Sequence, residues 1–115
     1  MANSGLYGPY PLTANGVAAN VKGKGAGAYA LGSTDADGVF RIAYVGRSDD
    51  HLAGRLQQHV LEPYLQFKHA FFPSAKAAFD KECWLYHTFT PPDNKVHPAR
   101  PRNANWSCPG CKTFD

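Results

Sequence analysis

Two short apolar segments joined by an Asp-Gly pair constrain the fold of this chain more than any other feature. Residues 27–32 and 39–46 are rich in Ala, Val, Ile and Tyr, and these residue types favour β-strands. Asp37-Gly38 between them favours a tight hairpin turn. The sequence therefore predicts an antiparallel hairpin over residues 27–46.

The position of the turn decides which residues of this hairpin lie opposite each other. A turn at Asp37-Gly38 places Tyr29 opposite Gly46, whereas a turn at Ala36-Asp37 places Tyr29 opposite Tyr44. Side chains alternate between the faces of a strand. Both registers therefore put the two tyrosines on one face.

A helix is expected directly after the hairpin. Ser48 and the two residues that follow it are capping types, and behind them Leu52, Leu56 and Val60 recur at helical spacing. The helix is predicted to run to about Leu61, because a proline follows at position 63.

The second half of the chain predicts one more strand and one more helix. Residues 64–72 are rich in aromatics and end before a proline, and Ser74 is placed to cap a helix over residues 75–89. Glu82 falls inside the apolar stripe of that helix, where an ionised carboxylate is costly unless it is paired or bound to a metal. The order of elements permits an α/β (α+β) domain with a small antiparallel sheet flanked by helices.

The remaining segments and the composition place limits on the rest of the molecule. With 115 residues, 43% of them hydrophobic, the chain has room for one globular domain. Residues 1–26 show no period and are predicted to be a flexible N-terminal arm, ahead of a domain over residues 27–94 and a tail over residues 95–115. Neither a leader peptide nor 18 consecutive apolar residues is present, so we expect a soluble cytoplasmic protein without a membrane segment.

Several short motifs, in order and at compatible spacings, resemble those of the GIY-YIG nuclease superfamily. The resemblance covers roughly residues 27–94, and its parts together are far more specific than either tripeptide alone. The residues that carry it are Gly27-Ala28-Tyr29, Tyr44-Val45-Gly46, Arg55 and His59 on the first helix, Glu82 on the second, and Asn94.

This resemblance implies an α/β (α+β) domain with a small three-stranded antiparallel sheet flanked by helices. It also implies a divalent-metal-dependent endonuclease that hydrolyses phosphodiester bonds. Glu82 would bind Mg²⁺ or Mn²⁺, and Arg55 would hold the scissile phosphate with its planar fork. Tyr29 would orient or deprotonate the attacking water, Tyr44 would offer a second hydroxyl to the phosphate, and His59 would relay the proton.

The departures from the family pattern are few. Ala28 and Val45 replace bulkier apolar residues on the face away from the tyrosines, which leaves the implied chemistry intact. Asn103 and Asn105 compete with Asn94 for the asparagine position, and His59 corresponds to a histidine that only some members have.

We expect nucleic acid as the partner, DNA ahead of RNA, and leave open whether the protein acts as a monomer or a dimer. The formal charge of +3 is modest for tight nucleic-acid binding. An alternative is a non-catalytic nucleic-acid-binding or zinc-stapled interaction module of the same fold. The cationic residues expected to contact the nucleic-acid backbone are Arg47, Lys68, Lys95, Arg100 and Arg102.

Three cysteines predict a second site of a different kind. Cys108-Pro109-Gly110-Cys111 resembles a zinc knuckle, and Cys83 and His87, four residues apart on the second helix, are placed to complete a structural Zn²⁺ site on its outer face. His97 is a rival ligand. Reduced thiols in a merely packed tail, or a redox pair, are the alternatives.

Overall fold

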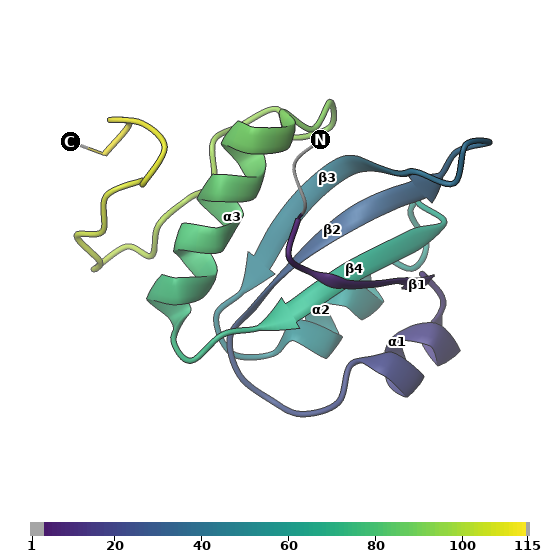
Figure 1. Cartoon of the computed structure of the whole chain (residues 1–115). Coiled ribbons are helices and arrows are strands. Elements are labelled where there is room, and N and C mark those ends of the chain that lie inside the picture. Colours follow the sequence, from purple (N-terminus) through teal and green to yellow (C-terminus); the bar gives the residue numbers. More distant parts are fainter. Residues whose placement is uncertain (1–3, 115) are drawn as a thin grey trace.

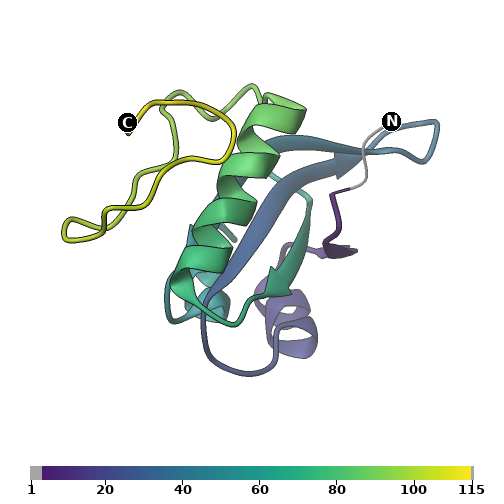
Figure 2. The ribbon, with the colours of Figure 1, turned by 60° about the vertical axis from the view of Figure 1, so that its left-hand side comes forward.

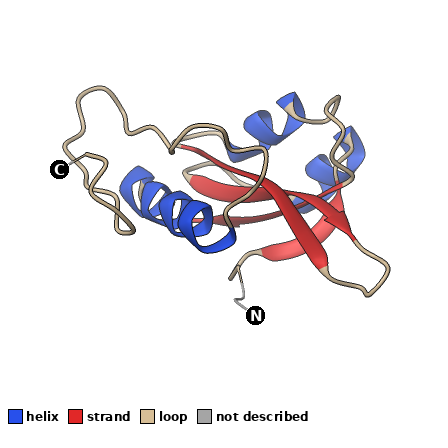
Figure 3. Cartoon of the chain, turned by 90° about the horizontal axis from the view of Figure 1, so that it is seen from above, coloured by secondary structure: helices blue, strands red, loops and turns tan. Residues whose placement is uncertain are grey.

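The computed structural model describes residues 4–114 and shows an α+β fold, a class that the sequence predicted (Figure 1). The four strands form one antiparallel sheet in the order β1-β4-β2-β3. Helices α1 and α2 cover one face of this sheet and α3 the other, as Figure 3 shows from above. In chain order the elements are β1 (Tyr7–Pro11), α1 (Ala14–Asn20), β2 (Gly27–Thr34), β3 (Phe40–Ser48), α2 (Leu52–Gln58), β4 (Gln66–Phe71) and α3 (Ala75–Phe89).

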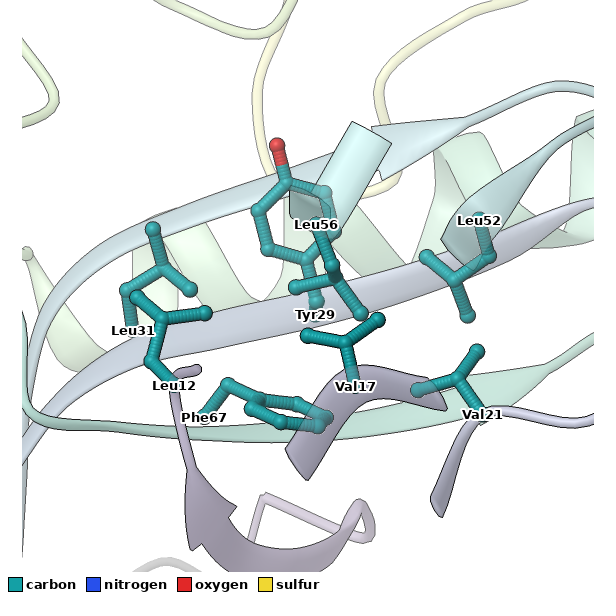
Figure 4. Close-up of a cluster of buried hydrophobic side chains, with 8 residues drawn as sticks. All are labelled: Leu12, Val17, Val21, Tyr29, Leu31, Leu52, Leu56 and Phe67. Atoms are coloured by element: carbon teal, nitrogen blue, oxygen red, sulfur yellow. The ribbon is translucent and has the colours of Figure 1, made fainter. Parts of the chain in front are cut away.

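The fourth strand and the first helix correct the prediction of a three-stranded sheet behind a flexible arm. Within the predicted arm, β1 pairs with β4, and α1 begins at Thr13, whose hydroxyl caps the helix. Leu12, Val17 and Val21 are buried against α2 and the sheet (Figure 4). Residues 1–3 of the arm lie outside the described residues. The described part of the predicted arm, residues 4–26, therefore contributes to the core instead of forming a flexible lead-in.

The β2–β3 hairpin adopts the first of the two predicted registers, with Tyr29 opposite Gly46, but reaches it by a different route. The turn is centred on Ala36 and Asp37, and Gly38 has a φ of 80°, which favours glycine. Gly38 is one loop residue more than the predicted two-residue turn at Ala36-Asp37, and it shifts the register of that turn by one residue. An irregularity in the pairing between Leu31 and Gly32 shifts it by one more. The two tyrosines share a face, as both registers required.

The helices agree with the prediction to different degrees. α3 and its cap Ser74 match it, whereas α2 begins after His51, whose Nδ1 accepts from the Gly54 N–H, and ends at Gln58. The predicted cap Ser48 instead accepts from the backbone N–H of His51. Leu52 and Leu56 are fully buried, as their spacing predicted.

The described tail, residues 95–114, contains no helix or strand and lies along the outer side of α3 (Figure 2). Phe79 and Cys83 of α3 pack against Cys108, with Trp106 and Phe114 around them. The tail is thus held by side chains rather than by backbone pairing. Among the described residues, no helix is long and apolar enough to cross a membrane.

Candidate active site and metal centre

A cavity of about 270 Å³ opens at the edge of β3 and gathers most of the predicted site. β3 is an edge strand, so side chains from both faces of the sheet can meet beside it. Tyr29 of β2 and Tyr44 of β3 reach the cavity from one face of the sheet. Arg55 of α2 and His59 at its end line the cavity as well, and Glu82 of α3 comes from the other face. Five of the six predicted catalytic residues line the cavity: Tyr29, Tyr44, Arg55, His59 and Glu82.

A hydrogen-bonded chain runs from Tyr29 through His59 to Glu62. The Tyr29 hydroxyl lies 2.8 Å from His59 Nε2, and His59 Nδ1 lies 2.8 Å from Glu62 Oε1. An ionised carboxylate only accepts, so Nδ1 carries the proton, and in the neutral ring Nε2 accepts from the tyrosine. Glu62 was not predicted, because it follows the helix; its spacing of three from His59 was the available signal.

The glycine of the second motif is explained by this tyrosine. A Cβ atom at Gly46 would overlap the Tyr29 hydroxyl, so only glycine lets the phenol lie across β3. Burial, and then the nearby Tyr44, raises the pKa of Tyr29 far above its ordinary value of 10. Tyr29 is therefore a neutral hydroxyl at physiological pH.

Glu82 is 8% exposed and is paired with Arg47, which was predicted as a contact to nucleic acid. Arg47 Nη1 donates to Glu82 Oε1 at 2.7 Å and to the Ala99 carbonyl at 2.6 Å, while its Nε donates to Asp49 at 2.8 Å. Burial raises the pKa of Glu82, and the hydrogen bond from Arg47 opposes this shift. Arg47 is thus part of the cavity wall rather than a free surface cation.

Asn94 lies outside the cavity, unlike the other predicted catalytic residues. Its Oδ1 accepts from the Val45 N–H at 2.8 Å and its Nδ2 donates to the Val45 carbonyl at 3.0 Å. The side chain therefore occupies the free edge of β3 much as a neighbouring strand would. Asn94 therefore supports β3 at a position outside the cavity, and its catalytic role stays a prediction.

The other predicted nucleic-acid contacts do not line the cavity. Lys68 lies over the Phe40 ring on the α3 side of the sheet. Arg100 donates to the Trp106 carbonyl and lies over Phe114 within the tail. Lys95 and Arg102 are exposed, and their contact with nucleic acid stays a prediction.

A second cluster of four side chains joins the tail to α3. The ligand atoms of His87, His97, Cys108 and Cys111 all lie within 4.8 Å of one another and could hold a metal ion such as zinc. Cys108 Sγ lies 3.4 Å from His87 Nε2, and Cys111 Sγ lies 3.3 Å from His97 Nε2. Zinc bonds of about 2.3 Å to sulfur and about 2.0 Å to nitrogen place these atoms about 3.5 Å apart at a tetrahedral angle.

The rival ligand His97 takes the place that was predicted for Cys83 in this cluster. Cys83 is fully buried with Phe79 under the tail, and burial raises the pKa of its thiol strongly. The wheel geometry of α3 predicted an outward position for Cys83. Cys83 does lie on the face of α3 that points away from the sheet, but the tail covers this face.

Neighbouring groups orient the cluster for metal binding. His97 Nδ1 donates to the Pro98 carbonyl at 2.9 Å, which leaves Nε2 unprotonated and directed at Cys111. The hydroxyl of Thr113, 2.9 Å from Cys111 Sγ, is the main cause that lowers the pKa of this thiol to about 6. A Cβ atom at Gly110 would overlap the His87 ring, which explains the glycine of the Cys-Pro-Gly-Cys turn.

Comparison of the chain with protein-family models, curated proteins and solved structures finds no match. The family resemblance therefore rests on the motif residues themselves. Function has to be argued from the chemistry of the cavity and the cluster.

Proposed function

We propose that this protein is a divalent-metal-dependent endonuclease that hydrolyses phosphodiester bonds of nucleic acid, with DNA as the expected substrate. The observation that carries the proposal is the convergence of Tyr29, Tyr44, Arg55, His59 and Glu82 in one polar cavity at the β3 edge. These residues come from separate elements, and the motif resemblance assigns all of them to the same reaction.

The donor set of the cavity suits a hard cation. Glu82 and Asp49 both line it, and carboxylate oxygens are the ligands that Mg²⁺ and Mn²⁺ prefer. Glu82 would hold the ion, and Asp49, which also lines the cavity and is paired with Arg47, is a second carboxylate there. When bound, the ion would supply Lewis-acid stabilisation of the phosphate charge and an activated water.

The chain's own groups account for proton movement. Because the Tyr29 hydroxyl donates its hydrogen to His59 Nε2, the phenolic oxygen is left as an acceptor for a water in the cavity. As that water attacks phosphorus, its proton passes to the Tyr29 oxygen while the phenolic proton passes to His59 Nε2. The P–O bond to the leaving sugar oxygen breaks in the same step, and this oxygen takes a proton from solvent water. Glu62 stabilises the imidazolium that results.

Arg55 and Tyr44 are the groups that face the phosphate. Arg55 is exposed at the cavity, so its guanidinium is available to a phosphate oxygen. The Tyr44 ring lies beside His59, with centroids 5.7 Å apart, on the same side of the hairpin as Tyr29. Both side chains can therefore reach a phosphate held in the cavity.

One observation favours the alternative, a non-catalytic nucleic-acid-binding module. Arg47 occupies Glu82 Oε1, and a guanidinium there competes with a metal ion for the carboxylate. A module of this kind would bind nucleic acid with strong salt dependence but would not cleave it.

The two functions are separated by incubating the protein with single-stranded DNA, duplex DNA and RNA in Mg²⁺ or Mn²⁺. We expect cleavage of at least one substrate by the wild type, loss of cleavage in Glu82→Ala, and retention in Asp80→Asn on the same helix. Cleavage that persists in Glu82→Ala, or no cleavage with any substrate, contradicts the nuclease proposal; binding without cleavage supports the module.

We also propose that the second cluster holds a structural Zn²⁺ ion through His87, His97, Cys108 and Cys111. Two imidazoles and two thiols at tetrahedral spacing are a donor set that zinc prefers. Purified protein should carry one zinc per chain, Cys111→Ser should lose it, and Cys83→Ala should keep it. Wild-type protein without stoichiometric zinc would favour the reduced-thiol or redox alternatives.

A further inference from the structure

Three consecutive residues connect the tail cluster to the cavity. His97 belongs to the cluster, and its Nδ1 donates to the carbonyl of the buried Pro98. The next carbonyl, that of Ala99, lies in the cavity wall and accepts from Arg47 Nη1 at 2.6 Å. The same Nη1 donates to Glu82. A single short path therefore leads from a proposed zinc ligand to the proposed ligand of the catalytic metal.

We propose that metal binding at the tail cluster positions Arg47 through residues 97–99, and so favours the Arg47–Glu82 ion pair over a divalent cation in the cavity. The inference rests on both proposed metal sites, the zinc cluster and Glu82. It adds a role for the tail: zinc occupancy sets how readily the cavity accepts its own metal ion.

The position of the Ala99 carbonyl depends on the cluster because the aromatic packing that also holds the tail lies further along the chain, at Trp106 and Phe114. None of the described residues 95–114 is in a helix or strand, and Ala99 itself is exposed. Ordering such a segment costs conformational entropy, which bound metal can offset. Without metal, four closely spaced ligand groups no longer hold the tail against α3, and the carbonyl is free to leave the cavity wall.

Arg47 responds because its three polar partners come from different parts of the chain. Asp49 and Glu82 belong to the domain, and the Ala99 carbonyl belongs to the tail. Loss of the carbonyl removes one partner and admits water to a guanidinium that is 12% exposed. Water weakens the ion pair with Glu82. A cation that competes with Arg47 for Glu82 then binds more tightly.

The coupling is tested in the zinc-loaded full-length protein by NMR of the Arg47 Nε–Hε group, assigned with Arg47→Lys. This proton donates to Asp49, but it belongs to the same guanidinium as Nη1, so its exchange reports water that enters around the group when the Ala99 carbonyl leaves. We expect exchange of Hε with water to become at least about tenfold faster when a zinc-selective chelator removes the metal. Cys111→Ser should show the same change, and Lys112→Ala, an exposed tail residue outside the cluster, should not. Val17 methyl resonances verify that the domain remains folded.

A second variant keeps the metal but breaks the link. Two glycines inserted between Pro98 and Ala99 should leave zinc bound, yet accelerate Hε exchange as chelation does. This variant decides the question if chelation or Cys111→Ser unfolds the domain. Hε exchange unchanged by the insertion overturns the proposed coupling.

Mn²⁺ titration followed by electron paramagnetic resonance measures how tightly Glu82 binds a divalent cation when the link is intact and when it is broken. We expect Mn²⁺ affinity to rise at least about threefold in the insertion variant, and to be absent in Glu82→Ala. An unchanged or lower affinity overturns the proposed competition. If no Mn²⁺ binds in any form while Hε exchange responds, the coupling stands and the metal role of Glu82 fails.

Discussion

Tyr29 is the residue at which the two sequence motifs meet. Its ring crosses to β3, where Gly46 leaves room for the hydroxyl, and the hydroxyl contacts His59 beyond the end of α2. The motif residues therefore depend on one another sterically as well as chemically. The motif resemblance pointed to the tyrosine and the histidine but not to Glu62, because a carboxylate in a loop shows no periodicity and acquires its role only by contact.

Glu62 is expected to act on cleavage rather than on folding. Glu62→Gln keeps the side-chain shape but removes the charge that supports an imidazolium at His59, so cleavage should slow by about tenfold or more with an unchanged KM. The pair is partly exposed, with 46% of the Glu62 side chain accessible, so the unfolding free energy should change by less than about 0.5 kcal/mol. Asp80→Asn, which removes the negative charge from the partly exposed pair with Lys76, is the matched control. A changed KM with an unchanged kcat would contradict the relay.

Glu82 is expected to lower stability in its ionised form. Burial raises its pKa in the folded protein above 4.5, so the folded state holds the proton more tightly than the unfolded state does. The contribution of Glu82 to stability is therefore greatest at low pH and falls as the pH rises from about 4.5 through the folded pKa. Thermal denaturation across this range should show wild type losing stability relative to Glu82→Gln. A difference that is constant with pH, or of opposite sign, would contradict the role of burial.

At the scale of elements, the β3 edge is supported by a side chain instead of a fifth strand. Both amide atoms of Asn94 bond to Val45, so Asn94→Ala should lower the unfolding free energy by about 2 kcal/mol, as measured by urea denaturation. Asn105→Ala, at an exposed tail position, should change it by less than about 0.5 kcal/mol. Cleavage per folded molecule should survive Asn94→Ala if Asn94 acts only as support; complete loss of cleavage at unchanged stability would favour the catalytic role.

The elements that could be predicted are those long enough to show a hydrophobic period and preceded by a capping residue. α3 has fifteen residues behind Ser74, long enough for a helical period to be visible, and it was predicted to its ends. α1 has seven residues with two Asn and Gly16 among them, so propensity argues against it. It forms because Val17 enters the core between α2 and the sheet. β1 likewise exists only through its pairing with β4, which no local pattern records.

At the scale of the whole molecule, the two proposed metal ions should be separable by what their removal changes. The tail cluster is built from thiols and imidazoles and joins the tail to α3, whereas the cavity offers the carboxylate oxygens of Glu82 and Asp49. A zinc-selective chelator should therefore affect folding of the tail, whereas removal of Mg²⁺ should affect only cleavage.

Removal of zinc should loosen the tail, and removal of Mg²⁺ should not. A zinc-selective chelator is expected to lower the melting temperature by at least about 5 °C, because a metal that binds only the folded state stabilises it. It should also make Cys108, which loses its metal, and Cys83, which is fully buried beneath the tail, reactive to alkylation, since neither is in a disulfide. Withdrawal of Mg²⁺ should abolish cleavage while both cysteines remain protected. If chelation leaves Cys83 protected, packing of Phe79, Trp106 and Phe114 holds the tail without the metal.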